Sequence, residues 1–135
     1  MSDSIISQLR AKAIRYSKHA HAPYSNAHIG SALETVDGQI FGGCNIENSS
    51  YGGTVCAERV AIWKTMSELG ATKIKRIYVY SKDGWPPCGM CRQVMSEFAD
   101  ENMDVIIGDG SGNEKTFKFK ELLPLSFTPD YLIKK

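Results

Sequence analysis

The sequence of 135 residues predicts an α/β fold, in which helices cover a mixed sheet and residues 1–135 form one domain. Runs with the apolar spacing of helices alternate along the chain with short runs of β-branched and aromatic residues. Two strand–helix–strand units in the middle of the chain require crossover connections, which align their strands in one sheet. Hydrophobic residues make up 42% of the sequence, an ordinary value for a domain with a buried core.

The N-terminal part of the chain is predicted to form a helix and then a β-hairpin. Residues 4–18 carry apolar side chains at the spacing of one helical face. Residues 29–35 and 39–45 are predicted as two strands, and residues 36–38 between them, Val-Asp-Gly, suit a short hairpin turn. The chain therefore begins with the order helix, strand, strand.

The second half of the chain alternates helices and strands. The predicted elements are helices over residues 56–69 and 89–100, strands over 76–81, 105–107 and 116–119, and one helical turn over 121–123. Gly70 suits the left-handed conformation that often ends a helix. Both crossover helices therefore start near the carboxyl ends of strands, where α/β sheets hold their ligands.

The charge of the chain argues against polyanionic partners. The formal net charge is +1, and the lysines and arginines are scattered along the sequence, which predicts no nucleic-acid or membrane partner. No apolar run reaches the length of a membrane span, and the first residues lack the pattern of a signal peptide. We therefore expect a cytoplasmic protein that acts on a small, nearly neutral molecule.

Three of the four cysteines have a spacing that is typical of a metal site. Cys88 and Cys91 can chelate from one helical turn, and Cys56 can bind from the start of the other crossover helix. Helix N-termini lower the pKa of thiols and so favour the thiolate that binds metal. Three soft thiolates suit zinc, and a catalytic zinc keeps its fourth position open for water.

An acidic residue next to this cysteine pattern points to catalysis. Glu58 lies two positions after Cys56, so its carboxylate can face the open metal position without ligating. A carboxylate there can move a proton from water to substrate, as in zinc deaminases that act on cytosine. Because three thiolates leave a zinc site at about −1, we expect Arg59 to offset that charge through a hydrogen bond to a sulfur.

Two other interpretations of the cysteines remain open from the residues alone. Cys88 and Cys91 also fit a thioredoxin-like redox pair, which needs neither a third cysteine nor a neighbouring acid. A structural zinc site would need a fourth ligand, which Cys44 or one of the three histidines could supply. These histidines are His19, His21 and His28.

Five motifs in order resemble the cytidine deaminase family, specifically its small single-domain branch, over about residues 22–129. The motifs are Ala22-Pro23-Tyr24-Ser25, Gly43-Cys44-Asn45-Ile46-Glu47-Asn48, Thr54-Val55-Cys56-Ala57-Glu58-Arg59, Pro87-Cys88-Gly89-Met90-Cys91-Arg92-Gln93, and Glu121-Leu122-Leu123-Pro124 followed by Phe127. The resemblance implies a three-layer α/β fold, in which a mixed five-stranded sheet has helices on both faces. It also implies hydrolysis of cytidine and deoxycytidine to uridine and deoxyuridine plus ammonia, in pyrimidine salvage.

The resemblance implies roles for individual residues. One zinc per chain would be bound by Cys56, Cys88 and Cys91, and Glu58 would move the proton. Asn45 and Glu47 would bind the ribose. The main chain near Ala57 and the residue Pro87 would contact the base. Arg59 and Gln93 would support the thiolates. Small family members are homotetramers, in which Tyr51 and Phe127 would reach a neighbouring subunit's site.

One position departs from the family pattern. Ala27 stands where the family usually has a Phe that packs on the base, so the pocket is expected to be roomier. A modified cytosine nucleoside, such as a blasticidin-type antibiotic, is therefore an alternative substrate. The intact ribose pair, Asn45 and Glu47, argues against that alternative.

Overall fold

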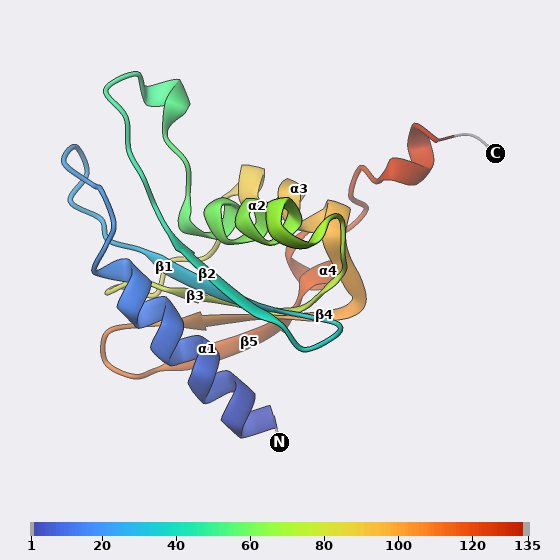
Figure 1. Cartoon of the computed structure of the whole chain (residues 1–135), viewed down its shortest axis with the longest axis horizontal. Helices are drawn as coiled ribbons and strands as arrows, with labels where there is room; N and C mark the ends of the chain where they lie inside the picture. The colour runs from blue at the N-terminus through green and yellow to red at the C-terminus, as the bar shows by residue number, and fades with distance from the viewer. Residues whose placement is uncertain (1, 134–135) are drawn as a thin grey trace.

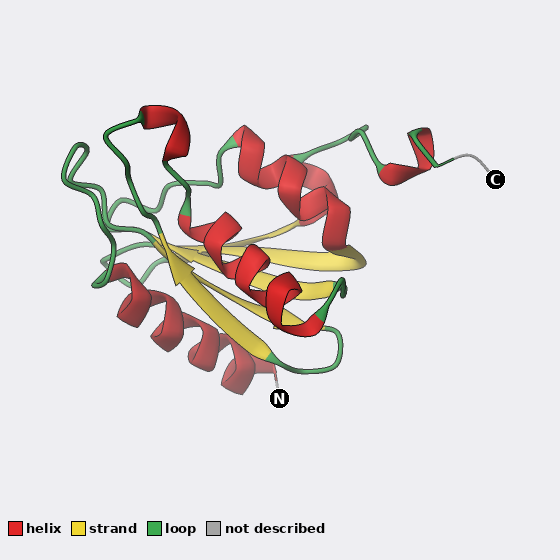
Figure 2. Ribbon diagram, turned by 45° about the horizontal axis from the view of Figure 1, so that its top comes forward, coloured by secondary structure: helices red, strands yellow, loops and turns green. Residues whose placement is uncertain are grey.

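A five-stranded sheet between two layers of helices forms the core of the structure, a computed structural model that describes residues 2–133 (Figures 1 and 2). The helices are α1 (Ser2–Ser17), α2 (Ala57–Leu69), α3 (Gly89–Phe98) and α4 (Phe119–Leu122), with the 3-10 helices η1 (Tyr51–Gly53) and η2 (Pro129–Tyr131). The strands are β1 (Gly30–Thr35), β2 (Ile40–Cys44), β3 (Ile74–Tyr80), β4 (Ala99–Gly108) and β5 (Glu114–Lys118). The predicted fold class is confirmed. No helix in this described part is long and apolar enough to cross a bilayer.

The order of the strands is β2-β1-β3-β4-β5, and the sheet is mixed as predicted. Strand β1 pairs antiparallel with both β2 and β3, and β3 pairs parallel with β4. Strands β2, β3 and β4 therefore all run in the same direction. Because α2 follows β2 and α3 follows β3, both crossover helices begin at the same end of the sheet, where the loops gather in Figure 2.

Alternation along the central strands divides the core between the two faces. Leu33 of β1 packs on the side of α2 and α3, with Ile62 and Met95 from these helices. Ala32, its neighbour in the strand, packs on the opposite face beneath α1, with Leu9 and Ala13. All six residues of β1 are buried, as expected for a strand covered on both faces.

The greatest difference from the sequence prediction is strand β4, which begins at Ala99 rather than at residue 105. Residues 99–104 are mostly polar and lack β-branched side chains, so their composition gave no strand signal. Pairing with neighbouring strands extends β4 instead: Ala99 pairs with Ile74, and Asp104 forms an ion pair of 2.8 Å with Lys118. Helix α3 correspondingly ends at Phe98.

Helix α1 approaches the sheet most closely at Gly30. A Cβ atom built on Gly30 would lie 1.7 Å from the carbonyl oxygen of Ala13, and that oxygen belongs to helix backbone that cannot move aside. The absence of a side chain at Gly30 therefore allows α1 to lie directly on β1.

We expect Gly30→Ala to lower the free energy of unfolding by about 3 kcal/mol, because the added methyl group forces α1 off the sheet. Urea denaturation followed by circular dichroism measures the loss. Gly52→Ala is the matched control, since a Cβ atom at Gly52 meets nothing within 4 Å. Equal stability of the two variants would contradict the close packing of α1 on β1.

Candidate metal centre

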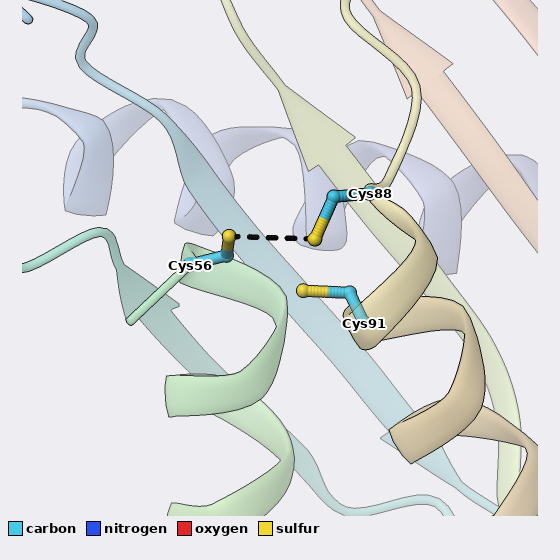
Figure 3. Close-up of side chains that lie close together, drawn as sticks. All are labelled: Cys56, Cys88 and Cys91. Atoms are coloured by element: carbon cyan, nitrogen blue, oxygen red, sulfur yellow. Dashed lines mark hydrogen bonds between the residues drawn. The ribbon is translucent and has the colours of Figure 1, made fainter. Parts of the chain in front are cut away.

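The side chains of three cysteines converge between the first turns of α2 and α3. Cys56 is the N-cap of α2, Cys88 is the N-cap of α3, and Cys91 lies in the first turn of α3. Their sulfur atoms all lie within 4.8 Å of one another, and the sulfurs of Cys56 and Cys88 are 3.7 Å apart (Figure 3). The predicted meeting of these thiols at the helix starts is confirmed.

The donor set of this cluster fits zinc. Three cysteine sulfurs are soft ligands, and their mutual distances allow all three to bind one ion. Within the part of the chain that the structure describes, the cluster contains these three residues and no histidine, carboxylate or fourth cysteine. Three protein ligands leave one position of a tetrahedron free, which is the arrangement of a catalytic zinc rather than of a closed structural site.

The thiols do not share one protonation state. The pKa of Cys56 is lowered to about 5, chiefly because the Cys91 thiol donates a hydrogen bond to it and also because Arg59 lies beside it. The pKa of Cys91 is raised by the same hydrogen bond and by burial. The Cys56 sulfur is thus favoured as a thiolate, and metal binding releases a proton from Cys91.

Glu58 lies in the first turn of α2, beside the cluster but outside the ligand group. Its side chain is buried, with 4% of the residue exposed. Burial raises the pKa of the Glu58 carboxyl to about 7, and the negative charge of Cys56 adds to this effect. At neutral pH such a group can both accept and donate a proton, which is the property required of an acid–base residue.

Arg59 connects the two helices that carry the cysteines. Its Nη2 donates to the sulfur of Cys56 at 3.4 Å, which is the contact expected from the sequence. Its Nη1 donates to the sulfur of Met90 at 2.8 Å, and its guanidinium lies 5.8 Å from the centre of the Trp63 ring. The contacts of Met90 and Trp63 were not predicted, because neither residue carries a polar or charged signal. The positive charge therefore lies beside the thiolate that it offsets.

Asn45 and Glu47 follow β2 and hold the segment before β1. Asn45 is buried; its Nδ2 donates to the carbonyl of Ala27 at 2.7 Å, and its Oδ1 accepts from the backbone N–H of Ile29 at 2.9 Å. The Glu47 carboxylate accepts from the backbone N–H groups of Tyr24 and Ser25 and from the Ser25 hydroxyl. These donors lower the pKa of Glu47, the Ser25 hydroxyl contributing most.

A small cavity lies next to Glu47. It has a volume of about 240 Å³ and is lined by Tyr24, Glu47, Tyr51 and Thr54. The ring centres of Tyr24 and Tyr51 are 5.8 Å apart, and Tyr51 is 75% exposed. One carboxylate and two aromatic residues thus border an open space at the loop end of the sheet.

Phe127 and Gln93 meet each other. Phe127 is 55% exposed and stacks on Tyr131, with ring centres 5.6 Å apart. Gln93 donates to the carbonyl of Phe127 at 2.9 Å and to Ser96, rather than to a cysteine sulfur. The reason is geometric: Gln93 lies two residues after Cys91, about 200° around the helix. Ala57 is buried at the first position of α2, and Pro87, which directly precedes Cys88, is also buried.

Comparison with known proteins decides the family of this chain. Residues 3–107 match the family model described as the cytidine and deoxycytidylate deaminase zinc-binding region. The chain belongs to this family. It is 42% identical over 121 residues to a cytidine deaminase from Halalkalibacterium halodurans, with 88% of this chain and 91% of the relative covered.

Solved structures of cytidine deaminases share the fold. The crystal structure of the cytidine deaminase from Burkholderia pseudomallei matches with a TM-score of 0.85 and 36% identity, covering 90% of this chain and 98% of that chain. A blasticidin-S deaminase from Bacillus cereus is more distant, at 32% identity over 111 residues, with 75% of this chain and 77% of that protein covered. The comparisons therefore favour the cytidine deaminases over the antibiotic deaminases.

We expect Cys91→Ala to abolish stoichiometric zinc binding, because two remaining thiols cannot hold the ion against a chelator. Atomic absorption after dialysis against a weak chelator measures the metal, and circular dichroism checks that the variant is folded. Cys44→Ala is the control, since Cys44 is buried but does not belong to the cluster. Retention of one zinc per chain by Cys91→Ala would contradict three-thiolate ligation.

Proposed function

We propose that this protein is a zinc-dependent cytidine deaminase, which hydrolyses cytidine and deoxycytidine to uridine and deoxyuridine with release of ammonia. The observation that carries the proposal is the buried Glu58 carboxyl beside three converging thiols, a ligand set that leaves one tetrahedral position for water. The names of the relatives from Halalkalibacterium halodurans and Burkholderia pseudomallei support the same activity. We further infer one domain over the whole chain, a cytoplasmic location and a role in pyrimidine salvage.

The residues of the centre divide the reaction between them. Cys56, Cys88 and Cys91 would hold the zinc, which would supply a Lewis acid that makes water nucleophilic at neutral pH. Glu58 takes a proton from the water that attacks C4 of the cytosine ring and passes it to N3, where attack places negative charge. Arg59 keeps Cys56 charged and oriented throughout.

Glu58 also completes the second half of the reaction. After the attack on C4, the C4–N4 bond breaks and the nitrogen leaves as ammonia. Glu58, which has given its first proton to N3, takes the second proton from the hydroxyl group now on C4 and delivers it to this nitrogen, so that C4 becomes a carbonyl carbon. An amine is a far better leaving group when protonated. A pKa of about 7 suits this exchange, because Glu58 must both accept and donate a proton in each step at neutral pH.

The loop end of the sheet supplies the contacts to the substrate. Glu47 lines the 240 Å³ cavity and binds a ribose hydroxyl there, while the second N–H of Asn45 donates to the sugar. The main chain near Ala57 and the residue Pro87, which adjoin Cys56 and Cys88 in the sequence, line the edge of the base. A buried polar group such as Asn45 rejects analogues that lack the matching hydroxyl group.

We also propose that the protein is a homotetramer in which neighbouring subunits complete each site. Tyr51 and Phe127 are large aromatic residues with more than half of their surface exposed. The segment after α4 leads away from the sheet and carries further exposed apolar side chains (Figure 1). These are Leu125, Tyr131, Leu132 and Ile133. Such a segment gains burial when it packs on another subunit.

Glu58→Gln tests the acid–base assignment. We expect kcat for cytidine to fall by about 10³-fold or more, because the amide can neither take nor deliver the proton. The loss of absorbance as cytidine becomes uridine measures kcat, and zinc content is measured on the same sample. The control is Glu68→Gln, an exposed carboxylate later in α2. Near-normal turnover by zinc-loaded Glu58→Gln would contradict the mechanism.

A mixing experiment tests the shared site. Phe127→Ala and Glu58→Gln are each expected to be nearly inactive alone. If Phe127 acts in a neighbour's site, random mixed tetramers regain about a quarter of full activity, because one subunit supplies Glu58 and another supplies Phe127. Activity is measured after the two variants are unfolded and refolded together. No recovery in tetramers shown to be mixed by mass spectrometry would contradict shared sites.

A further inference from the structure

The side chain of Met90 turns toward α2, although the residue lies between two metal ligands in the sequence. These ligands are Cys88 and Cys91. The sulfur of Met90 accepts a hydrogen bond of 2.8 Å from Nη1 of Arg59, a residue of α2. Met90 is also 63% exposed, so little of its surface contributes to the apolar core. The hydrogen bond of its sulfur, rather than burial, is therefore what this side chain can contribute.

Arg59 connects the sulfur of Met90 to a metal ligand. Its Nη2 donates to the sulfur of Cys56 at 3.4 Å, while its Nη1 donates to Met90. The guanidinium is planar and rigid, so its N–H groups keep fixed directions relative to one another. An acceptor that binds Nη1 therefore determines where Nη2 points.

The guanidinium of Arg59 depends on these acceptors for its orientation. Arg59 is buried, and its Nε has no hydrogen-bond partner within residues 2–133. Its guanidinium carbon lies 5.8 Å from the centre of the Trp63 ring, a contact that favours the cation but directs no single N–H group. Without the Met90 sulfur, a second donor atom of this buried group would lose its acceptor, and the guanidinium would turn toward water to regain one. The hydrogen bond to Cys56 would then weaken.

A hydrogen bond to a thiolate changes what that thiolate gives to a metal. It withdraws electron density from the sulfur, so the sulfur donates less to the ion and the ion stays a stronger Lewis acid. A stronger Lewis acid favours the activation of water. The orientation of Arg59 therefore affects the metal as well as the net charge of the centre.

We propose that Met90 is a positioning residue, whose sulfur holds the guanidinium of Arg59 against the Cys56 sulfur and so tunes the metal for deamination. The effect on deamination rests on the proposed function, whereas the effect on the sulfur rests on the cysteine cluster and Arg59 alone. What Met90 supplies is a hydrogen-bond acceptor. A polar side chain of similar length can therefore replace it, and an apolar side chain of similar volume cannot.

The test compares Met90→Leu with Met90→Gln in the full chain. Leu has nearly the volume of Met but no acceptor, whereas the amide oxygen of Gln can accept from Nη1 of Arg59. Each protein is loaded with Co²⁺ in place of zinc, because charge transfer from thiolate to cobalt absorbs light and reports the electron density on the sulfur atoms. The same proteins loaded with zinc are assayed for kcat and KM with cytidine, and metal content is measured on every sample.

Met90→Leu is expected to shift the charge-transfer band to longer wavelength, because a sulfur without its hydrogen bond gives up an electron more easily. Its kcat is expected to fall about tenfold, with a KM within about twofold of the wild-type value, since substrate contacts are unchanged. Met90→Gln is expected to keep the band position and a kcat within about threefold of the wild type. A side chain that acted only by packing would give the opposite order, because Leu fills its space better than Gln does.

Met66→Leu is the matched control. Met66 lies near the C-terminal end of α2, and its sulfur also accepts a hydrogen bond, from the backbone N–H of Thr72 at 3.4 Å. The same loss of a sulfur acceptor far from the cysteines is expected to leave the cobalt band and kcat as in the wild type. Met90→Ala replaces Met90→Leu if that protein melts at a lower temperature.

Each part of the inference can fail separately. An unshifted band in Met90→Leu, or equal changes in Met90→Leu and Met90→Gln, would overturn the positioning role. A shifted band with unchanged kcat would overturn the part in deamination. Absence of cytidine turnover in the zinc-loaded wild type would overturn the proposed function, and the cobalt band would still decide whether Met90 acts on the Cys56 sulfur.

Discussion

Strands β2, β3 and β4 run in one direction, and this shared direction determines where the two crossover helices begin. It requires α2 and α3 to begin at the same end of the sheet. Because both crossovers also move in the same direction across the sheet, right-handed connections place the two helices on one face, where Ile62 and Met95 pack together. Two helix N-termini, each with its partial positive charge, are thereby brought together around Cys56 and Cys88. A single turn of each helix then supplies all three thiols, so the metal centre needs no ligand from a flexible loop.

The buried charges of this centre depend on one another. A partly buried thiolate at Cys56 would cost free energy of desolvation without a positive charge beside it, and the guanidinium of Arg59 supplies that charge. Arg59 also connects α2 to α3 through its hydrogen bond to Met90. The same thiolate and the burial of Glu58 raise the pKa of the carboxyl to about 7. Arg59 acts on the Glu58 carboxyl in the opposite direction and lowers its pKa, so burial, the largest effect, is what holds that pKa near neutrality.

The sequence was sufficient for the features that depend on local spacing. Cys56, Cys88, Cys91 and Glu58 all lie within one turn of a predicted helix start, and the strand–helix order brings those starts together. Features that depend on distant partners were missed or misplaced. Residues 99–104 are a strand because of pairing rather than composition, and Gln93 meets Phe127 because of its position around α3. The partners of Asn45 and Glu47 lie in an irregular segment that no periodicity predicts.

The number of protein ligands on the metal separates a catalytic centre from a structural one most directly. X-ray absorption at the zinc edge of the purified, zinc-loaded protein measures the type and number of ligand atoms. A coordination shell of three sulfur atoms and one lighter atom, which changes when a cytidine analogue is added, is the predicted result. A closed shell of four protein ligands that the analogue leaves unchanged would contradict the account, because no position would remain at which water could be activated.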